Sequence, residues 1–411
     1  MNYFIKNIHV NKLFHLNNFD IPIDDEKYPH LIITGKNGSG KTILLNALTD
    51  FLDHIKEDKN LYFLQYGDWV KKGEQQLQNA QTEEARTKAE LNLREFRQRY
   101  DSLYGKINIE FGNVANIVKK YQEDNFILVA YEAYRKPAMQ EPENPTKPVY
   151  NKNGDVKDTA TSQFLNFLSD LKIQEALARN EKQIKDADEI GAWFKDFEGL
   201  MRQIYQDDNL KLEFNYRDYS FRICTEGKKF KFTEVSDGFA AVLDIVADLI
   251  LKMQDGKSLT RIYQKEGIVL IDEIETHLHL ALQKVIMPLL TRVFPNIQFI
   301  ITTHSPFILS SMPNAVAYDL EHREVLDDLT EYSYESLAEG YFGVATPSSY
   351  VEMQLDCFKK LVLKKDLTDA DKVELKRLKA DFEKMNEVVS PLIVGEFRQI
   401  AIQNADKLKD L

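Results

Sequence analysis

The stretch LIITGKNGSGKTILLNAL, residues 31–48, limits the fold more than any other part of the sequence. Its first residues are apolar or β-branched and predict a buried strand, and the apolar spacing after Thr42 predicts a helix. GKNGSGKT lies between them and fits the pattern G-x-x-x-x-G-K-[ST], whose glycines let backbone N–H groups converge on a phosphate. A strand, this loop and a helix in that order predict an α/β fold of the P-loop NTPase class.

The residues of the loop would share the binding of a nucleoside triphosphate. The following helix presents its N-terminus to the phosphates, and its dipole favours negative charge there. Lys41 can reach the β- and γ-phosphates, and the Thr42 hydroxyl can hold Mg²⁺. The expected nucleotide-binding residues of this segment are Gly35, Asn37, Gly38, Ser39, Gly40, Lys41 and Thr42.

Two acidic residues follow another apolar run in GIVLIDEIETHLHL, residues 267–280. In a P-loop protein, the first of them orients a water on Mg²⁺, so we expect Asp272 and Thr42 to hold the metal. Glu273 is then available to polarise the attacking water. Taken alone, the pattern fits an ordinary buried strand with a solvated acidic turn equally well, and the P-loop upstream favours the catalytic interpretation.

Two more segments add residues to this site. In FIITTHSPFIL, residues 299–309, a buried strand ends next to His304, at the sheet edge where ligands collect, and we predict that His304 contacts the γ-phosphate. In FTEVSDGFAAVLDIVADLI, residues 232–250, Ser236 is a plausible N-cap of an apolar helix and Gly238 allows close backbone approach. By itself the second pattern fits a plain capped helix.

The order of these four motifs resembles that of the ABC-type ATPase heads, a class that includes transporter subunits and the SMC, RecF and OLD proteins. VSDGF stands where those heads have an LSGGQ-like signature, although Asp237 replaces its first glycine and Phe239 its glutamine. IDEIETHLH resembles the D-E-x-E-x-x-L-H pattern of the RecF and OLD branch, which implicates Glu275 and His279 in the contact between subunits. The resemblance is good over residues 1–55 and 220–320.

The resemblance implies that two heads sandwich ATP between them. The P-loop and the pair Asp272–Glu273 of one chain would face Ser236 and Gly238 of its mate, so a homodimer or a higher oligomer is expected. Glu273 would then act as the base or water-positioning residue, and His304 as the γ-phosphate sensor. The family also uses a glutamine to ligate Mg²⁺, and Gln65 and Gln140 are alternatives for it that stay open.

Within that class the chain is similar to the ATPases of Septu and retron antiphage systems, which act beside a separate nuclease or toxin. We therefore expect an ATP hydrolase that controls such an effector. The alternative is a RecF-like DNA repair ATPase that binds nucleic acid directly, for which the lysine clusters of residues 227–232 and 363–379 are the candidates. A non-hydrolysing scaffold is a third class, and the intact catalytic motifs argue against it. DAD, residues 369–371, is interpreted as a helix cap rather than a nuclease metal cluster.

Composition indicates the cellular compartment and limits the kinds of partner that the protein can have. A formal charge of −12 argues against a surface that is entirely a nucleic-acid platform. Two distant cysteines and no CxxC motif favour a reducing compartment, and the sequence has no run of about 18 apolar residues for a membrane span. We therefore expect a cytoplasmic protein with no membrane partner.

The pattern along the chain predicts four regions and three less regular segments. Residues 68–104 are expected to form one long exposed helix, with a short coiled-coil arm as the alternative. Residues 136–158 are expected to form a long loop, and the aromatic stretch 332–355 either a docking surface or a helical cap on the sheet edge. The predicted regions are 1–60 with the P-loop, 61–215 as an insertion of helices and strands, 216–325 with the other three motifs, and 326–411 as a mostly helical tail.

Overall fold

In the computed structural model the chain forms two compact units, residues 1–331 and 332–411. The sequence predicts four regions, which divide the chain more finely than these two units do, and those four regions stay a prediction. The structure describes residues 4–23, 29–58, 60–135, 139–143, 155–254, 265–326, 349–364, 366–384 and 391–405, together with a few isolated positions between them.

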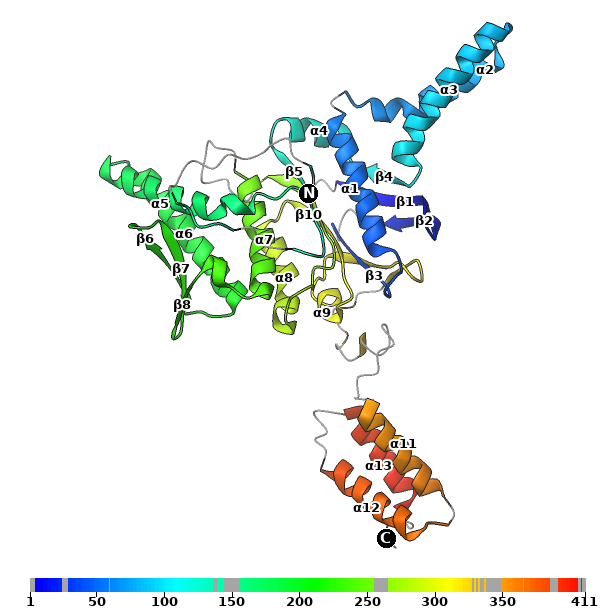
Figure 1. Cartoon of the computed structure of the whole chain (residues 1–411), viewed down its shortest axis with the longest axis vertical. Coiled ribbons are helices and arrows are strands. Elements are labelled where there is room, and N and C mark those ends of the chain that lie inside the picture. The colour runs from blue at the N-terminus through cyan, green and yellow to red at the C-terminus, as the bar shows by residue number, and fades with distance from the viewer. Residues whose placement is uncertain are drawn as a thin grey trace. The chain divides into compact units, whose positions relative to one another are not determined.

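A six-stranded sheet in the order β12-β11-β3-β10-β9-β5 forms the centre of the first unit (Figure 1). The last five strands in this order are parallel, and β12 is antiparallel to β11 at the edge. The parallel strands are almost entirely buried, which explains their continuous apolar sequences. The strands are β3 (His30–Thr34), β5 (Phe126–Tyr131), β9 (Glu266–Ile271), β10 (Ile297–Thr302), β11 (Ala315–Asp319) and β12 (Glu324–Leu326).

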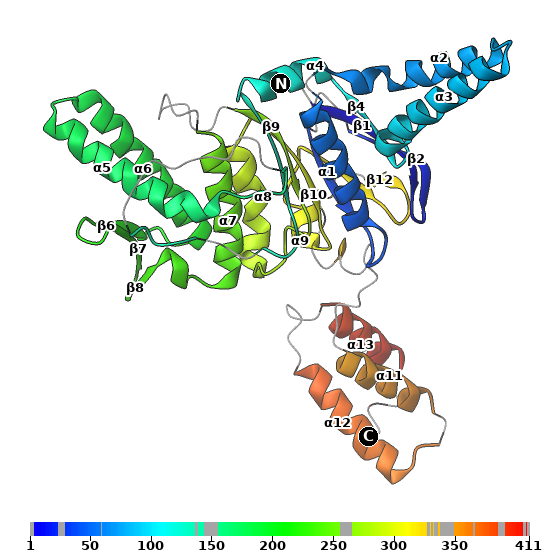
Figure 2. The ribbon, with the colours of Figure 1, turned by 45° about the horizontal axis from the view of Figure 1, so that its top comes forward.

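Helices cover both faces of this central sheet. Figure 2 shows α1 on one side of the sheet and α7 and α8 on the other. Because the parallel strands end at the same edge, the loops that follow β3, β9, β10 and β5 meet there. The helices and short 3₁₀ segments outside the α2–α3 and α5–α6 pairs are α1 (Lys41–Glu57), η1 (Tyr62–Gln65), α4 (Val114–Gln122), η2 (Thr161–Gln163), η3 (Phe232–Glu234), α7 (Asp237–Lys252), α8 (Leu280–Val293) and α9 (Pro306–Leu309).

Two small antiparallel sheets flank the central sheet. One has the order β2-β1-β4 and shares a single core with α1 and the central sheet. The other has the order β6-β7-β8 and precedes α7 in the sequence. Six short strands form these two sheets. Their bounds are β1 (Ile5–Leu13), β2 (Leu16–Pro22), β4 (Ile107–Phe111), β6 (Lys211–Asn215), β7 (Ser220–Thr225) and β8 (Lys228–Lys231).

A buried histidine begins β3, the strand that leads into the P-loop. His30 is only 5% exposed, and its Nδ1 accepts a hydrogen bond of 3.1 Å from the backbone N–H of Phe299 on β10. Burial disfavours the charged imidazolium and lowers the pKa of His30 to about 4. The fold therefore requires a neutral imidazole at this position.

We expect acid to destabilise the first unit through His30. The unfolded chain binds this proton below its ordinary pKa of 6.5, and the folded chain binds it only below about 4. Stability from this group is therefore complete above pH 6.5 and is lost as the pH falls toward 4, by about 2–3 kcal/mol at pH 4.5. Both tryptophans, Trp69 and Trp193, lie in this unit, so urea unfolding followed by tryptophan fluorescence reports on it.

His30→Asn is the matched variant for this measurement, because its side-chain oxygen can still accept the Phe299 N–H and does not titrate. The difference in unfolding free energy between wild type and variant should shrink by about 2–3 kcal/mol between pH 7 and pH 4.5. A difference that is the same at both pH values would contradict the assignment.

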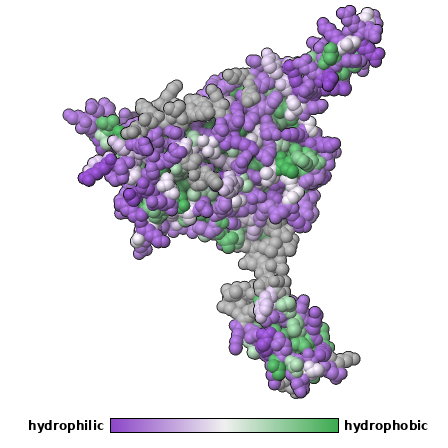
Figure 3. All heavy atoms as spheres, in the orientation of Figure 1, coloured by the Kyte–Doolittle hydropathy of each residue, from purple (hydrophilic) through white to green (hydrophobic). Residues whose placement is uncertain are grey.

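The single long helix predicted for residues 68–104 is wrong. The structure has two helices, α2 (Tyr66–Gln78) and α3 (Glu83–Tyr104), which run side by side as a projecting arm (Figures 1 and 2). Thr82 starts the second helix, since its hydroxyl accepts the N–H of Ala85 at 3.2 Å and two glutamates follow it in the first turn. Ala89 and Leu93 of α3 are buried, whereas the face of the arm seen in Figure 3 is mostly hydrophilic.

A second helical pair, α5 (Phe164–Asn180) and α6 (Ile184–Tyr205), lies between β5 and β6 in the sequence. Aromatic rings hold the two helices together, as in the edge-on contact of Phe167 with Trp193 at 5.6 Å between centroids. Buried Phe197 stacks on the same indole at 5.4 Å. This pair lies within residues 61–215, for which the sequence predicts helices and strands.

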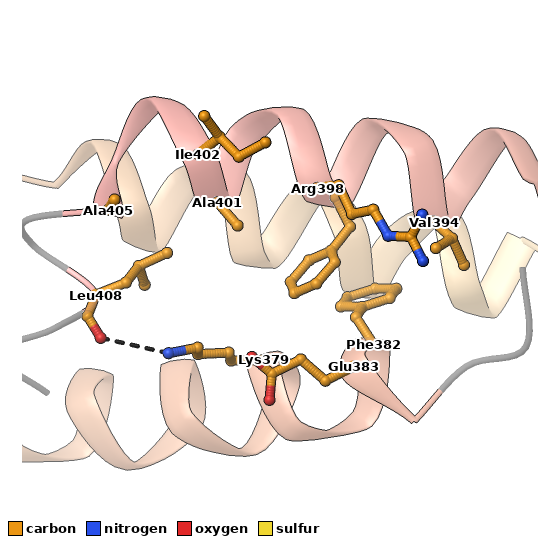
Figure 4. Close-up of a pocket in the computed structure, with 10 residues that line it drawn as sticks. Lys379, Phe382, Glu383, Val394, Arg398, Ala401, Ile402, Ala405 and Leu408 are labelled. Atoms are coloured by element: carbon orange, nitrogen blue, oxygen red, sulfur yellow. Dashed lines mark hydrogen bonds between the residues drawn. The ribbon is translucent and has the colours of Figure 1, made fainter.

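The second unit contains three helices in its described part, α11 (Ser349–Leu363), α12 (Asp369–Glu383) and α13 (Pro391–Gln403). Phe358, Phe382 and Phe397 pack together in its core. A cavity of about 480 Å³ lies between α12 and α13, with apolar walls and charged side chains at its rim, and the Lys379 ammonium donates to the carbonyl of Leu408 across one end (Figure 4).

The DAD sequence caps a helix, as predicted. Thr368 is the N-cap of α12, and its side chain and that of Asp371 form a reciprocal capping box. Most of the predicted loop 136–158 and most of the aromatic stretch 332–355 lie outside the described residues. Among the described residues, no helix is both long and apolar enough to cross a bilayer.

Candidate nucleotide-binding site

The P-loop connects β3 to α1 and has the backbone that its glycines were expected to provide. Gly35, Gly38 and Gly40 all have positive φ, at 134°, 83° and 102°. At Gly40 a Cβ atom would also lie 2.9 Å from the Leu16 side chain. Both the positive φ and this close contact therefore disfavour any larger residue there. The neighbouring His15, in the turn between β1 and β2, hydrogen-bonds through Nε2 to the Ser39 carbonyl at 3.1 Å and braces the loop from outside.

Lys41, the first residue of α1, is the cation of the loop. It is 5% exposed, and its ammonium donates to the carbonyls of Gly35 at 2.8 Å and Lys36 at 3.0 Å. Burial lowers the pKa of Lys41, and the negative charges of Glu273, Glu275, Asp272 and Asp319 oppose that shift. The ammonium is therefore held inside the loop and close to the acidic residues of the other motifs.

The backbone order of the sheet brings Asp272 and Glu273 beside the end of β10. Ile271 is paired with Ile301, so the residues after both strands meet. The Thr302 hydroxyl donates to the Asp272 carboxylate at 2.6 Å and accepts the backbone N–H of Glu273 at 2.7 Å. Asp272 is 5% exposed, and its own N–H donates to the Tyr131 carbonyl on β5. The acidic pair is thus fixed from both neighbouring strands.

The backbone of Glu273 adopts an uncommon conformation. Its φ is +41°, in the left-handed region that costs a non-glycine residue about 1–2 kcal/mol. The carboxylate accepts a hydrogen bond of 3.3 Å from the Thr276 hydroxyl and is partly exposed. Strain of this kind persists only where the surroundings impose it, and it is found most often at functional sites.

Thr42 and Asp272 line one cavity of about 310 Å³ between α1 and the end of β5. A hydroxyl and a carboxylate facing one cavity are oxygen donors of the type that Mg²⁺ prefers. The residues present therefore fit the magnesium site expected from the sequence. The other residues that line the cavity are Leu45, Asn46, Thr49, Ala130, Tyr131, Glu132, Ala133, Tyr134 and Lys157.

The two glutamines that the sequence left open do not belong to this cavity. Neither Gln65 nor Gln140 is among its described lining residues, and both side chains are exposed. The position directly after β5 is Glu132 instead. Its carboxylate accepts a hydrogen bond of 2.6 Å from the Lys157 ammonium, which also donates to Asn46.

His304 follows β10, as predicted, and is partly buried. Its backbone N–H donates to the carboxylate of Glu275, which lies in the loop after β9. Burial lowers the pKa of the His304 imidazole, and the positive charge of Lys41 lowers it further. His304 is therefore a neutral imidazole near the cation of the P-loop. Glu275 serves a contact within the chain here, and burial raises the pKa of its carboxyl.

The Ser236–Gly238 turn begins α7 and does not line the cavity of Thr42 and Asp272. Ser236 occupies the N-cap position, but its exposed hydroxyl makes no capping hydrogen bond, contrary to the expectation. Gly238 permits close approach as predicted, because a Cβ atom there would lie 2.7 Å from the carbonyl of His277. His279 caps α8 and contacts the ring of Phe239, so it too joins the turn to the loop after β9.

Two residues of this region had not been singled out from the sequence. Thr302 bridges the acidic pair as described above. Arg135, four residues after β5, is 7% exposed and donates to backbone carbonyls of the loop after β9. A polar residue just after a wholly apolar strand was the signal that could have pointed to it, because ligands collect at the carboxyl ends of parallel strands.

Solved structures with some likeness to the chain include two SMC heads. The head bound to the C-winged helix domain of ScpA is 12% identical, with a TM-score of 0.37, and the match covers 79% of this chain and 96% of that chain. The SMC head domain from Thermotoga maritima is also 12% identical, with a TM-score of 0.34, over 77% of this chain and 94% of that chain.

Curated relatives of the chain include Septu and retron proteins. A Septu protein PtuA of Bacillus mycoides (strain KBAB4) is 30% identical over 41% of this chain and 24% of its own length. A probable ATPase of retron Ec83 of Escherichia coli is 44% identical over 18% of this chain and 14% of its own length. A probable ATPase of retron Vc95 of Vibrio cholerae serotype O1 biovar El Tor is 32% identical over 28% of this chain and 21% of its own length. The chain thus matches less than a quarter of the length of each relative.

The match to a protein family is more extensive. Residues 70–310, more than half of the 411-residue chain, match the family described as "AAA domain, putative AbiEii toxin, Type IV TA system". This range includes the acidic pair, His304, Arg135 and the Ser236–Gly238 turn, and the P-loop precedes it. The chain belongs to this AAA domain family and is an ATPase related to those of antiphage defence systems.

Proposed function

We propose that two copies of this chain close on ATP and that hydrolysis separates them again. One observation carries the proposal. Ser236 is exposed at the N-terminus of α7 with its hydroxyl uncommitted to the helix, yet the turn does not line the cavity of its own P-loop. A helix N-terminus attracts anions, so the turn is suited to the triphosphate held by a second copy.

Within each site the residues have separate tasks. Lys41 and the P-loop amides hold the phosphates, and Glu273 orients and deprotonates the attacking water. His304 donates a hydrogen bond to the γ-phosphate as a neutral imidazole. Thr42 and Asp272 would hold Mg²⁺, which when bound offsets the charge that develops on the phosphates.

The dimer is proposed to control a separate effector, a nuclease or a toxin. Support comes from the similarity to Septu and retron proteins and from a family description that includes a toxin. Closing and opening of a dimer offers two states that a partner can distinguish. The effector would be active in only one of them.

Direct DNA binding is less well supported by the charges. In the first lysine cluster, Lys229 is paired with Glu213 across the sheet β6-β7-β8. In the second, Lys364 is paired with Asp371, and Arg377 with Glu374. Ion-paired surface cations are weak candidates for a groove that must release counterions from phosphates.

Sedimentation velocity tests the nucleotide sandwich. Glu273→Gln with ATP and Mg²⁺ should sediment as a dimer, and the same protein with ADP as a monomer, because only the triphosphate reaches both faces. Thr87→Arg, an exposed change in α3, serves as the control variant in the Glu273→Gln background and should dimerise equally. A monomer under both conditions, or a dimer that ignores the nucleotide, would refute the proposal.

Phage plating tests the control of an effector. Cells that carry the chain with its neighbouring genes should resist phage, and Glu273→Gln should change plating efficiency by at least about tenfold if hydrolysis switches the effector. Arg179→Met, an exposed change in α5, should plate like wild type. If the Glu273→Gln strain plates phage as efficiently as the wild-type strain, ATP hydrolysis by this chain does not control an effector.

A further inference from the structure

The Arg135 side chain makes an unusual set of contacts with backbone carbonyls. Its guanidinium donates to the carbonyl of Asp272 at 3.2 Å, of Glu273 at 3.2 Å and of Ile274 at 3.3 Å. A fourth bond of 3.3 Å goes to the carbonyl of Glu132, in the same turn after β5. One side chain therefore satisfies three consecutive carbonyls of the loop that carries the acidic pair.

These three carbonyls belong to the strained part of the loop. Glu273 has a φ of +41°, so its flanking peptide planes cannot continue the β9 strand and need partners outside the sheet. Thr302 binds the N–H of Glu273 from β10, and Arg135 binds the carbonyls from the side of β5. The backbone of Glu273 is held between the two neighbouring strands.

Buried groups of α7 also act on the end of β5 and on the guanidinium. Burial lowers the pKa of Arg135, and the largest attraction that opposes this shift comes from Asp244, which is 4% exposed on α7. α7 is the helix that begins at the Ser236–Gly238 turn. A second contact joins the same two elements, because the Tyr131 hydroxyl at the end of β5 donates to the buried Asp248 of α7 at 2.7 Å.

We propose that Arg135 is a positioning residue for ATP hydrolysis, which fixes the backbone of residues 272–274 and thereby the direction of the Glu273 carboxylate. The proposal rests on the role of Glu273 proposed above. A planar guanidinium can reach several carbonyls in fixed directions, whereas a lysine ammonium is a compact point charge. The chemistry therefore calls for arginine at this position and not simply for a cation.

Steady-state kinetics together with nucleotide binding test this role. In Arg135→Met the kcat should fall about 100-fold while the Kd for a fluorescent ATP analogue stays within about threefold, because the P-loop is untouched and the base is misdirected. Arg135→Lys keeps the buried charge and should fold even if Arg135→Met does not, with kcat reduced about tenfold. Arg179→Met is the control for the loss of an exposed guanidinium and should match wild type.

A double-variant cycle with Glu273→Gln separates positioning from a general loss of structure. If Arg135 acts through Glu273, adding Arg135→Lys to Glu273→Gln should lower the residual kcat by less than about threefold. An additional fall as large as in the wild-type background, or an unchanged kcat in Arg135→Lys, would overturn the proposal. Wild-type turnover by Glu273→Gln alone would instead remove the proposed role of Glu273, so the two failures are distinguishable.

Discussion

Glu273→Gln should lower the kcat for ATP hydrolysis by about 10²–10⁴-fold and leave nucleotide binding intact. Glutamine has the size of glutamate and can keep the contact with Thr276, but it cannot accept a proton from water. The groups proposed to hold the triphosphate, Lys41 and the P-loop backbone, are separate from the Glu273 side chain. The loss should therefore appear in kcat and leave the Kd for ATP within about threefold.

Phosphate release under saturating ATP measures this effect, and a fluorescent ATP analogue gives the Kd. Glu266→Gln is the matched control, because Glu266 begins the same strand, β9, at the edge far from the nucleotide, and pairs with Lys120. It should retain wild-type kcat. Turnover by Glu273→Gln within threefold of wild type would assign the water-activating role to another residue and revive a scaffold that does not depend on hydrolysis.

The parts of the site that lie on regular, apolar strands could be predicted from the sequence. β3, β9 and β10 are largely apolar because both faces of the sheet are covered, and each leads into one of the motifs proposed to carry the chemistry. Positive φ at Gly35, Gly38 and Gly40 agrees with the loop pattern, since glycine adopts this backbone conformation without steric cost. Sequence order therefore sufficed to place Lys41, Asp272, Glu273 and His304 at one edge.

Contacts between distant segments could not be predicted in the same way. The positive φ of Glu273 depends on Thr302 and Arg135, which lie 29 and 138 residues away in the sequence. The glutamine of the resembling family was sought by residue type, whereas the cavity depends on which turn follows β5, and that turn brings Glu132. Such details arise from tertiary packing, which local patterns do not contain.

The break between the two helices of the arm could not be predicted from periodicity. Residues 79–82 contain no proline or glycine and are compatible with a helix, so periodicity alone favours one continuous helix. The ring centroids of Trp69 on α2 and Phe96 on α3 lie 5.9 Å apart, and Arg97 pairs with Glu74 at 2.8 Å. These contacts stabilise two antiparallel helices over one continuous helix. The Thr82 cap and the two glutamates after it were a local signal for the second helix start.

Mixing two inactive variants should restore ATP turnover if each site is shared between two chains. Ser236→Arg places a bulky side chain where the second chain's triphosphate would approach the α7 N-terminus. The misaligned triphosphate in that site should lower the kcat of the pure variant by at least about 100-fold. Ser236 is exposed and makes no capping bond, so the substitution leaves the fold of the chain intact. Glu273→Gln is inactive for the separate reason given above.

A mixed dimer of these variants contains one intact site. The Ser236→Arg chain supplies its unaltered P-loop and Glu273 to that site, and the Glu273→Gln chain supplies its unaltered Ser236. Random pairing of equal amounts makes half of the dimers mixed, so about a quarter of the wild-type sites, and of the wild-type rate, should return. Mixing Glu273→Gln with a Glu273→Gln chain that also carries Ser236→Arg is the control, and it should stay inactive. A rate equal to the sum of the separate variants would mean that each chain hydrolyses ATP by itself, because a site within one chain gains nothing from its neighbour.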